Sequence, residues 1–119
     1  MKHSVLIVED EALVRLIAVS MLQDAGFDTL EADTAEDALH LLEEHEGVCV
    51  LFSDVQLPGK MDGLALAQAV HDRWPAIGLL LTSGGVNVRR DQIPDDGQFL
   101  PKPYDANEMV EAVREKCET

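Results

Sequence analysis

The stretch Val48-Cys49-Val50-Leu51-Phe52-Ser53-Asp54 decides the fold. Its first six residues are apolar or small and rich in β-branched types, and the run ends on a carboxylate. Turn-forming residues follow at Leu57-Pro58-Gly59 and at Asp62-Gly63. A short apolar run bounded by turn residues is typical of a strand that is covered on both faces of a parallel sheet. The sequence therefore predicts Asp54 at the C-terminal end of a central strand, the edge where open α/β sheets place their chemistry.

Strand and helix patterns alternate five times along the chain. The expected strands are 4–8, 27–32, 48–54, 77–81 and 99–101, and the expected helices cover 14–25, 34–42, 64–74 and 105–113. The segment 86–97 contains Pro94 and little periodicity, which predicts a short or mobile fourth helix. This order of elements predicts an α/β fold of the flavodoxin-like class. Its doubly wound, five-stranded parallel sheet has the order 2-1-3-4-5 and about five flanking helices.

Length and charge limit the possible classes of protein. The 119 residues are expected to form one domain, 1–119, with no output domain. The formal net charge of −14 disfavours nucleic acid and membrane surfaces as direct partners. It favours a divalent cation or a basic protein surface. No apolar run approaches the roughly 18 residues that a membrane span needs.

The two cysteines are far apart in the sequence and do not form a C-x-x-C pair. Cys49 lies within an apolar run, so we expect it to be a small buried hydrophobic residue, and Cys117 lies near the end of the chain. No signal-peptide core follows Met1. Together these features predict a cytoplasmic protein in a reducing compartment.

Four of the predicted strands end on polar side chains at the same edge of the sheet. Glu9 and Asp10 follow the first strand, Asp54 ends the third, Thr82 follows the fourth and Lys102 the fifth. Three carboxylates within ~4–6 Å would repel one another by several kcal/mol at an effective dielectric near 20. The site must therefore raise a pKa, recruit a lysine or bind a cation, and hard oxygen ligands suit Mg²⁺. Such a site is equipped for nucleophilic attack on phosphorus.

The chain resembles the receiver domain of two-component response regulators, of the CheY-like kind. The match covers essentially the whole chain in family order. The motifs that carry it are Glu9-Asp10, Asp54, Leu57-Pro58, Met61-Asp62-Gly63, Thr82-Ser83 and Lys102-Pro103-Tyr104. Relative to the usual family pattern, Glu9 replaces the commoner Asp, Tyr104 replaces Phe, and Gly59-Lys60 lengthens the loop after Asp54.

The resemblance implies a phospho-accepting switch that is not a turnover enzyme. Asp54 would take a phosphoryl group from a histidine kinase or a histidine phosphotransfer protein, and the switch would then act on a downstream protein target. Mg²⁺, or Mn²⁺, would be held by Asp10, Asp54 and the Gln56 backbone carbonyl, and by Glu9 through water.

The resemblance also implies how the switch works. Thr82, Ser83 and Lys102 would contact the phosphoryl group, and the peptide bond before Pro103 would be cis. Thr82 would move toward the phosphate and Phe99 would follow it inward. That movement would remodel the face made by the segment 86–97, the fifth strand and the last helix.

The first helix suggests a docking surface for the partner. If Val14, Ile17, Ala18 and Met21 face the sheet, Leu16 points roughly the opposite way and Leu13 lies on the flank. Two exposed leucines beside the acidic site predict a contact for the histidine-bearing helices of a partner.

Three other functional classes are weighed against the switch. A haloacid-dehalogenase-like phosphatase would need a second acid two residues after its nucleophile, where this chain has Gln56. An FMN-binding protein would need amides and hydroxyls after the first strand, where Glu9-Asp10-Glu11 would repel phosphate. A receiver used only as a non-phosphorylated interaction module would not need a complete acidic site. Within the receiver class, a target-binding regulator, a phosphate shuttle and a phosphate sink all fit the sequence.

Overall fold

A computed structural model of the protein describes residues 3–118, which cover all but the ends of the expected domain 1–119. Five parallel strands form one sheet in the order β2-β1-β3-β4-β5. The strands are β1 (Ser4–Val8), β2 (Asp28–Ala32), β3 (Val48–Asp54), β4 (Gly78–Ser83) and β5 (Gln98–Pro101). The helices are α1 (Ala12–Asp24), α2 (Ala35–Glu44), α3 (Gly63–Arg73) and α4 (Ala106–Glu118). The predicted fold class and strand order are confirmed.

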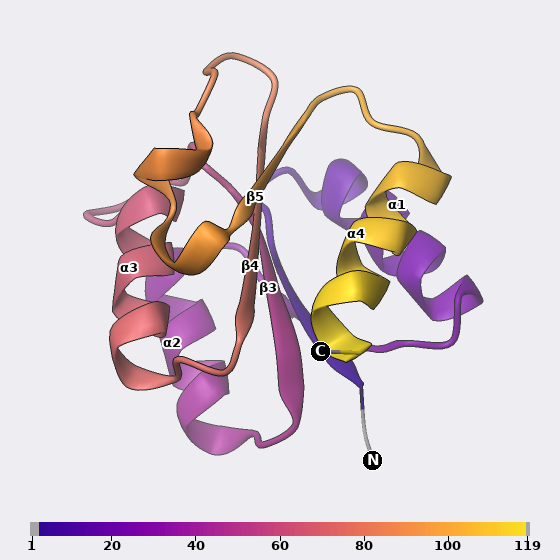
Figure 1. The fold of residues 1–119 in the computed structure, drawn as a ribbon, viewed down its shortest axis with the longest axis horizontal. Coiled ribbons are helices and arrows are strands. Elements are labelled where there is room, and N and C mark those ends of the chain that lie inside the picture. Colours follow the sequence, from indigo (N-terminus) through magenta and orange to yellow (C-terminus); the bar gives the residue numbers. More distant parts are fainter. Residues whose placement is uncertain (1–2, 119) are drawn as a thin grey trace.

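Helices cover both faces of the sheet, so the molecule has three layers (Figure 1). The helices α2 and α3 pack on one face, where Leu6, Leu51 and Leu81 are buried. On the opposite face α1 and α4 cover Ile7 and Phe52. Alternate residues of one strand thus enter different cores, which explains why β3 is apolar along nearly its whole length.

The segment between β4 and β5 contains no α-helix. It forms two 3₁₀ turns, η1 (Arg90–Gln92) and η2 (Pro94–Asp96), so residues 3–118 contain four α-helices rather than about five. Pro94 lacks an amide donor, and Asp95 adopts a left-handed backbone conformation with φ 55°. Neither feature is compatible with a continuous α-helix. The segment is nevertheless anchored, because Val88 and Ile93 are buried in the core on the α3 side.

The inward face of α1 differs from the expected one. Ala18, Val19 and Leu22 are its buried residues, whereas Ile17, which was predicted to face the sheet, is 48% exposed. The buried stripe therefore lies about one residue further round the helix. Ile17 joins Leu13 and Leu16 on the outer surface.

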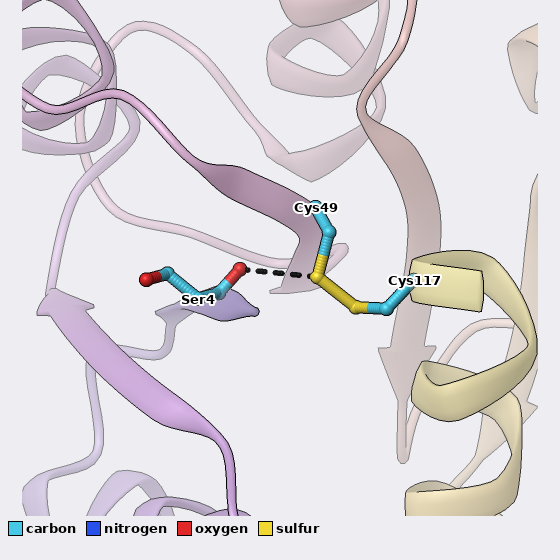
Figure 2. The surroundings of a disulfide bond; sticks show 3 residues. All are labelled: Ser4, Cys49 and Cys117. Atoms are coloured by element: carbon cyan, nitrogen blue, oxygen red, sulfur yellow. Dashed lines mark hydrogen bonds between the residues drawn. A yellow bond between two sulfur atoms is a disulfide. The ribbon is translucent and has the colours of Figure 1, made fainter. Parts of the chain in front are cut away.

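The cysteine prediction was wrong. Cys49, at the start of β3, forms a disulfide bond with Cys117, in the last turn of α4 (Figure 2). The spacing of the two cysteines did not predict this pairing, because they are 68 positions apart in the sequence. Only the fold brings their Cα atoms to a distance of 5.1 Å. The disulfide also removes the argument from cysteine usage for a reducing compartment. Among the residues that the structure describes, no helix has the length and apolar character needed to cross a bilayer.

Candidate functional site

The acidic residues predicted from the strand ends lie together. Glu9 directly follows β1 and Asp54 ends β3, the neighbouring strand in the sheet. One carboxylate oxygen from each of Glu9, Asp10 and Asp54 lies within 4.8 Å of the other two. Glu9 and Asp54 are only 4% and 8% exposed, whereas Asp10 lies at the surface. The cluster is therefore open to solvent on the side of Asp10.

Lys102 connects the two buried acids. Its Nζ donates to Glu9 Oε1 at 2.7 Å and to Asp54 Oδ2 at 2.9 Å. The Lys102 backbone is fixed by an amide hydrogen bond to the Ser83 carbonyl at 3.0 Å, and the peptide bond to Pro103 is cis. The ammonium thus balances part of the negative charge, which is one of the solutions that the repulsion argument required.

The environment shifts the titration of both partners. Burial raises the pKa of Glu9 above its usual value, and the hydrogen bond from Lys102 only partly opposes this effect. The charge of Asp54 raises the Glu9 pKa further. For Lys102, burial favours the neutral amine, but hydrogen bonds to Glu9 and Asp54 outweigh it and raise the pKa. Lys102 is therefore held as a cation between two acids.

The backbone around Asp54 orients its carboxylate. The Gln56 amide donates to Asp54 Oδ1 at 3.0 Å, and the Val55 amide donates to the Thr82 carbonyl at 2.8 Å. One carboxylate oxygen of Asp54 thus accepts from an amide and the other from Lys102. Both oxygens are held in fixed directions at the edge of the sheet.

Gly63 supports this geometry, although the sequence pointed to it only as part of a turn and of the Met61-Asp62-Gly63 motif. It begins α3, and its amide donates to the Val55 carbonyl at 2.7 Å. A Cβ at position 63 would overlap the Asp54 backbone carbonyl and lie 2.7 Å from Val55 Cα. Asp62 caps the same helix by accepting from the Ala65 amide at 2.9 Å. The close approach of α3 to β3 therefore requires glycine at this position.

The hydroxyl groups at the end of β4 form hydrogen bonds with the protein backbone. The Thr82 hydroxyl is buried and donates to the Leu100 carbonyl on β5 at 2.6 Å. The Ser83 hydroxyl accepts from the amides of Gly85 and Val86 and so shapes the loop after β4. Phe99 is partly buried against the core on the α3 side. The expected roles of Thr82, Ser83 and Phe99 at a phosphate remain predictions.

Tyr104 closes the site toward the core that α1 and α4 cover. Its ring packs edge-to-face on Phe52, with the ring centroids 5.7 Å apart. Burial raises the pKa of the Tyr104 hydroxyl, an effect that the charge of Lys102 opposes. Tyr104 also borders an apolar depression beside Lys102, together with Ile17, Gly84 and Pro103.

The acidic cluster suits a hard divalent cation. Its ligands are all carboxylate oxygens, and the exposed Asp10 leaves room for water, which Mg²⁺ usually retains. A second group of potential metal ligands lies at the other end of β3 from Asp54. It consists of His3, Cys49 and Cys117. Its two sulfur atoms are bonded to each other, so neither is the thiolate that zinc requires.

Comparison with known proteins agrees with this geometry. The family model described as "Response regulator receiver domain" matches residues 5–114. The chain belongs to the response regulator receiver domain family. Members of this family are phospho-accepting signalling modules rather than classical enzymes, and they interact with histidine kinases and downstream targets.

Individual relatives and solved structures agree with this assignment. The receiver domain is 35% identical to the sensor kinase CckA of Brucella abortus, covering 97% of this chain and 12% of that protein. A solved receiver domain from the hybrid histidine kinase CckA is 31% identical, with a TM-score of 0.81 over 96% of this chain and 98% of that one. The signal receiver domain of an HD domain-containing protein from Pseudomonas fluorescens Pf-5 is 25% identical, with a TM-score of 0.89 over 99% and 96%.

The curated relatives are longer proteins. The receiver domain corresponds to 12% of the Brucella sensor kinase, and to 24% of a putative NtrX-like response regulator of Rickettsia bellii with which it shares 31% identity. It corresponds to 47% of the transcriptional regulatory protein SrrA of Staphylococcus aureus, at 28% identity. Receiver domains of this kind thus occur both in kinases and in regulators.

Proposed function

We propose that Asp54 of this receiver domain accepts a phosphoryl group from a phosphohistidine of a histidine kinase or a histidine phosphotransfer protein. The observation that carries the proposal is the double anchoring of the Asp54 carboxylate by Lys102 Nζ at 2.9 Å and the Gln56 amide at 3.0 Å. These contacts keep the carboxylate oriented at the edge of the sheet, where Asp10 leaves the site open.

The reaction needs a nucleophile and positive charge at the same place. A carboxylate oxygen of Asp54 attacks phosphorus, the N–P bond of the phosphohistidine breaks, and the imidazole leaves with the bonding electrons and takes up a proton. Lys102 is already placed between Glu9 and Asp54 and can turn its ammonium toward the incoming phosphoryl oxygens. Its raised pKa keeps it charged for that role at neutral pH.

Glu9, Asp10, Asp54 and the Gln56 carbonyl would hold Mg²⁺ or Mn²⁺, with Glu9 acting through water. The three carboxylates supply the oxygen donors that such ions prefer. When bound, the ion would neutralise charge on the transferring phosphoryl oxygens. Burial of Glu9 and its bond to Lys102 support an indirect role for that residue.

Phosphorylation would signal through the face formed by residues 86–97, β5 and α4, and a downstream protein would recognise the altered face. The Thr82 hydroxyl links the phosphorylation site to that face, because it donates to Leu100 at the centre of β5. Exchanging this hydrogen bond for one to a phosphoryl oxygen would free the Leu100 carbonyl and the neighbouring Phe99. A phosphoryl group adds about −1.5 to −2 charges, which is enough to drive such an exchange.

The partner would dock on α1 beside the acidic site. Leu13, Leu16 and Ile17 are 70%, 56% and 48% exposed. Their spacing of three and four positions places them on one side of the first turns of α1, the helix that follows Glu9 and Asp10 in the chain. A helix-bearing partner that covers this surface would bring its histidine toward Asp54.

Intact-mass analysis tests the acceptor directly. The protein is incubated with Mg²⁺ and a small acyl phosphate, and one phosphoryl adduct of roughly 80 Da is expected. Asp54→Asn and an added chelator should each abolish the adduct. Asp28→Asn, which changes an exposed aspartate on β2, should leave it intact. An adduct that persists in Asp54→Asn would refute the proposed acceptor, and an unmodified parent protein would refute the proposed function.

The phosphatase alternative makes a different prediction. Catalytic turnover needs an acid to activate the leaving group or the water, and position 56 holds an amide instead. We therefore expect no turnover of a generic phosphomonoester under conditions in which Asp54 is phosphorylated. Sustained release of phosphate from such a substrate would favour the phosphatase.

A further inference from the structure

The disulfide joins the start of β3, at the far end of that strand from Asp54, to the end of α4. Cys49 begins β3 and Cys117 lies in the last turn of α4 (Figure 2). The imidazole of His3 provides a nitrogen within 4.8 Å of the sulfur atoms. Three residues from three distant segments thus form a compact group of two sulfurs and a base.

This group lies at the opposite end of β3 from Asp54. Asp54 lies five positions after Cys49, which corresponds to about 16 Å along an extended strand. All three members of the group are only partly buried, so small solutes can reach them. The group is therefore accessible and separate from the acidic cluster.

We propose that Cys49 and Cys117 are a reversible redox modification site whose oxidation by a peroxide ties α4 to β3. In the dithiol form, His3 takes the proton from the attacking thiol, because a neighbouring imidazole favours the thiolate. The thiolate sulfur attacks one peroxide oxygen and the O–O bond breaks, so that a sulfenic acid forms. The departing hydroxide takes the proton back from His3 and leaves as water. The second thiol attacks the sulfenic sulfur and releases another water as the S–S bond closes.

The reverse step restores the two thiols. A small dithiol attacks the bridge, forms a mixed disulfide and then closes on itself, releasing both protein thiols. Overall, one peroxide is reduced to two waters per bridge formed, and one dithiol is oxidised per bridge opened. The atoms and electrons therefore balance in both directions.

The chemical surroundings favour a neutral oxidant. The protein carries a formal net charge of −14, which repels anionic oxidants, whereas hydrogen peroxide is uncharged. The Cys49 sulfur lies 3.4 Å from the Ser4 carbonyl oxygen (Figure 2), a distance at which a thiol can donate. In the dithiol form this contact would hold the Cys49 sulfur close to where the bridge forms.

The fold does not depend on the bridge for its core. The middle of α4 is held in the core by three buried residues, Met109, Ala112 and Val113. Glu115 and Glu118, in its last turns, are exposed. Opening the bridge should therefore leave the domain folded and let the end of α4 fray. Oxidation would fix the end of a helix that contributes to the proposed signalling face.

Thiol chemistry on the folded protein tests the proposal. The protein is reduced with a phosphine, freed of reductant, and exposed to a small excess of hydrogen peroxide. We expect a mass decrease of two hydrogens and loss of both maleimide-reactive thiols, fully reversed by millimolar dithiothreitol. Amide hydrogen exchange over residues 114–118 should slow on the order of tenfold on oxidation. His3→Gln should slow closure several-fold without preventing it.

Single-cysteine variants and phosphorylation provide the controls. Cys117→Ser and Cys49→Ser should each gain one oxygen and show no change in exchange at the end of α4. A dithiol form that stays open in peroxide, or a bridge that resists dithiothreitol in the folded protein, would overturn the proposal. Phosphorylation of Asp54 by a small donor should proceed in both forms, so failure of the redox site is distinguishable from failure of the acceptor.

Discussion

Gly63 packs against Asp54 so closely that a Cβ at position 63 would overlap the Asp54 carbonyl oxygen. The contact joins the first residue of α3 to the residue that ends β3. The side chain that we propose as the phosphoryl acceptor thus owes its position partly to a residue that has no side chain.

Gly63→Ala should displace the backbone at Asp54. Overpacking of this kind costs about 1–3 kcal/mol, and we expect the free energy of unfolding in urea to fall by roughly that amount. Phosphorylation by a small donor should slow as well. Gly84→Ala is the matched control, because a Cβ there would meet only the Lys102 side chain, at 3.7 Å. Equal stability of the two variants would show that β3 and α3 can separate without cost.

Lys102 is the cation that balances the two buried acids. Lys102→Met leaves Glu9 and Asp54 facing each other without this cation. In the presence of chelator we expect the free energy of unfolding to fall by about 2 kcal/mol. This loss is smaller than for a fully buried ion pair because Lys102 is partly exposed. Added Mg²⁺ should stabilise the variant more than the parent protein. Lys60→Met, at an exposed loop position, should change neither the stability in chelator nor the stabilisation by Mg²⁺. A variant that is as stable as the parent in chelator would contradict the pairing.

The pH dependence of stability follows from Glu9. Because the folded protein raises the Glu9 pKa above 4.5, ionised Glu9 destabilises the folded state at neutral pH, and this cost disappears as pH falls toward 4.5. In chelator, Glu9→Gln should therefore be more stable than the parent at pH 7, with the difference shrinking at lower pH. Denaturant unfolding between pH 7 and pH 4.5 measures this difference in stability, and Glu11→Gln, at an exposed residue, is the control. A difference that grew toward low pH would mean that the Glu9 pKa is lowered instead.

Much of the fold could be predicted from the sequence because its signals are local. Short apolar runs bounded by turn residues, such as 48–54 and 77–81, are typical of strands buried on both faces, and their alternation with helices predicts a parallel sheet. The segment 86–97 was less predictable, because Val88 and Ile93 are held by the core rather than by helical periodicity. The exposed position of Ile17 likewise depends on how α1 is rotated against the sheet.

The site was predictable to the extent that it lies at strand ends. Glu9, Asp54 and Lys102 were expected together because parallel strands end at one edge, and they do lie together. Two features depended on contacts that sequence spacing does not encode. One is the packing of Gly63 on Asp54, and the other is the pairing of Cys49 with Cys117.

The apolar surface on α1 can be tested without knowing the natural partner. Leu16→Glu, alone or with Leu13→Glu, should reduce phosphoryl transfer from a phosphorylated histidine phosphotransfer protein by tenfold or more. The substitution would replace an apolar contact with the partner by a buried charge. Phosphorylation by a small acyl phosphate should be unchanged. Val86→Glu places the same charge at an exposed apolar residue outside α1 and serves as control. Loss of both reactions would indicate damage to the fold instead of the docking surface.

Thr82 provides the link between the acidic site and β5. Thr82→Val keeps the shape of the side chain but removes the donor to the Leu100 carbonyl, which should cost about 1–2 kcal/mol of stability, whereas Thr82→Ser should retain most of it. If the hydroxyl exchanges Leu100 for a phosphoryl oxygen, phosphorylation should speed amide hydrogen exchange at residues 98–100 in the parent and in Thr82→Ser. In Thr82→Val, where no hydrogen bond is exchanged, that increase should be absent although Asp54 still carries the phosphoryl group. The same increase in Thr82→Val would show that β5 senses phosphorylation by a route that bypasses this hydroxyl.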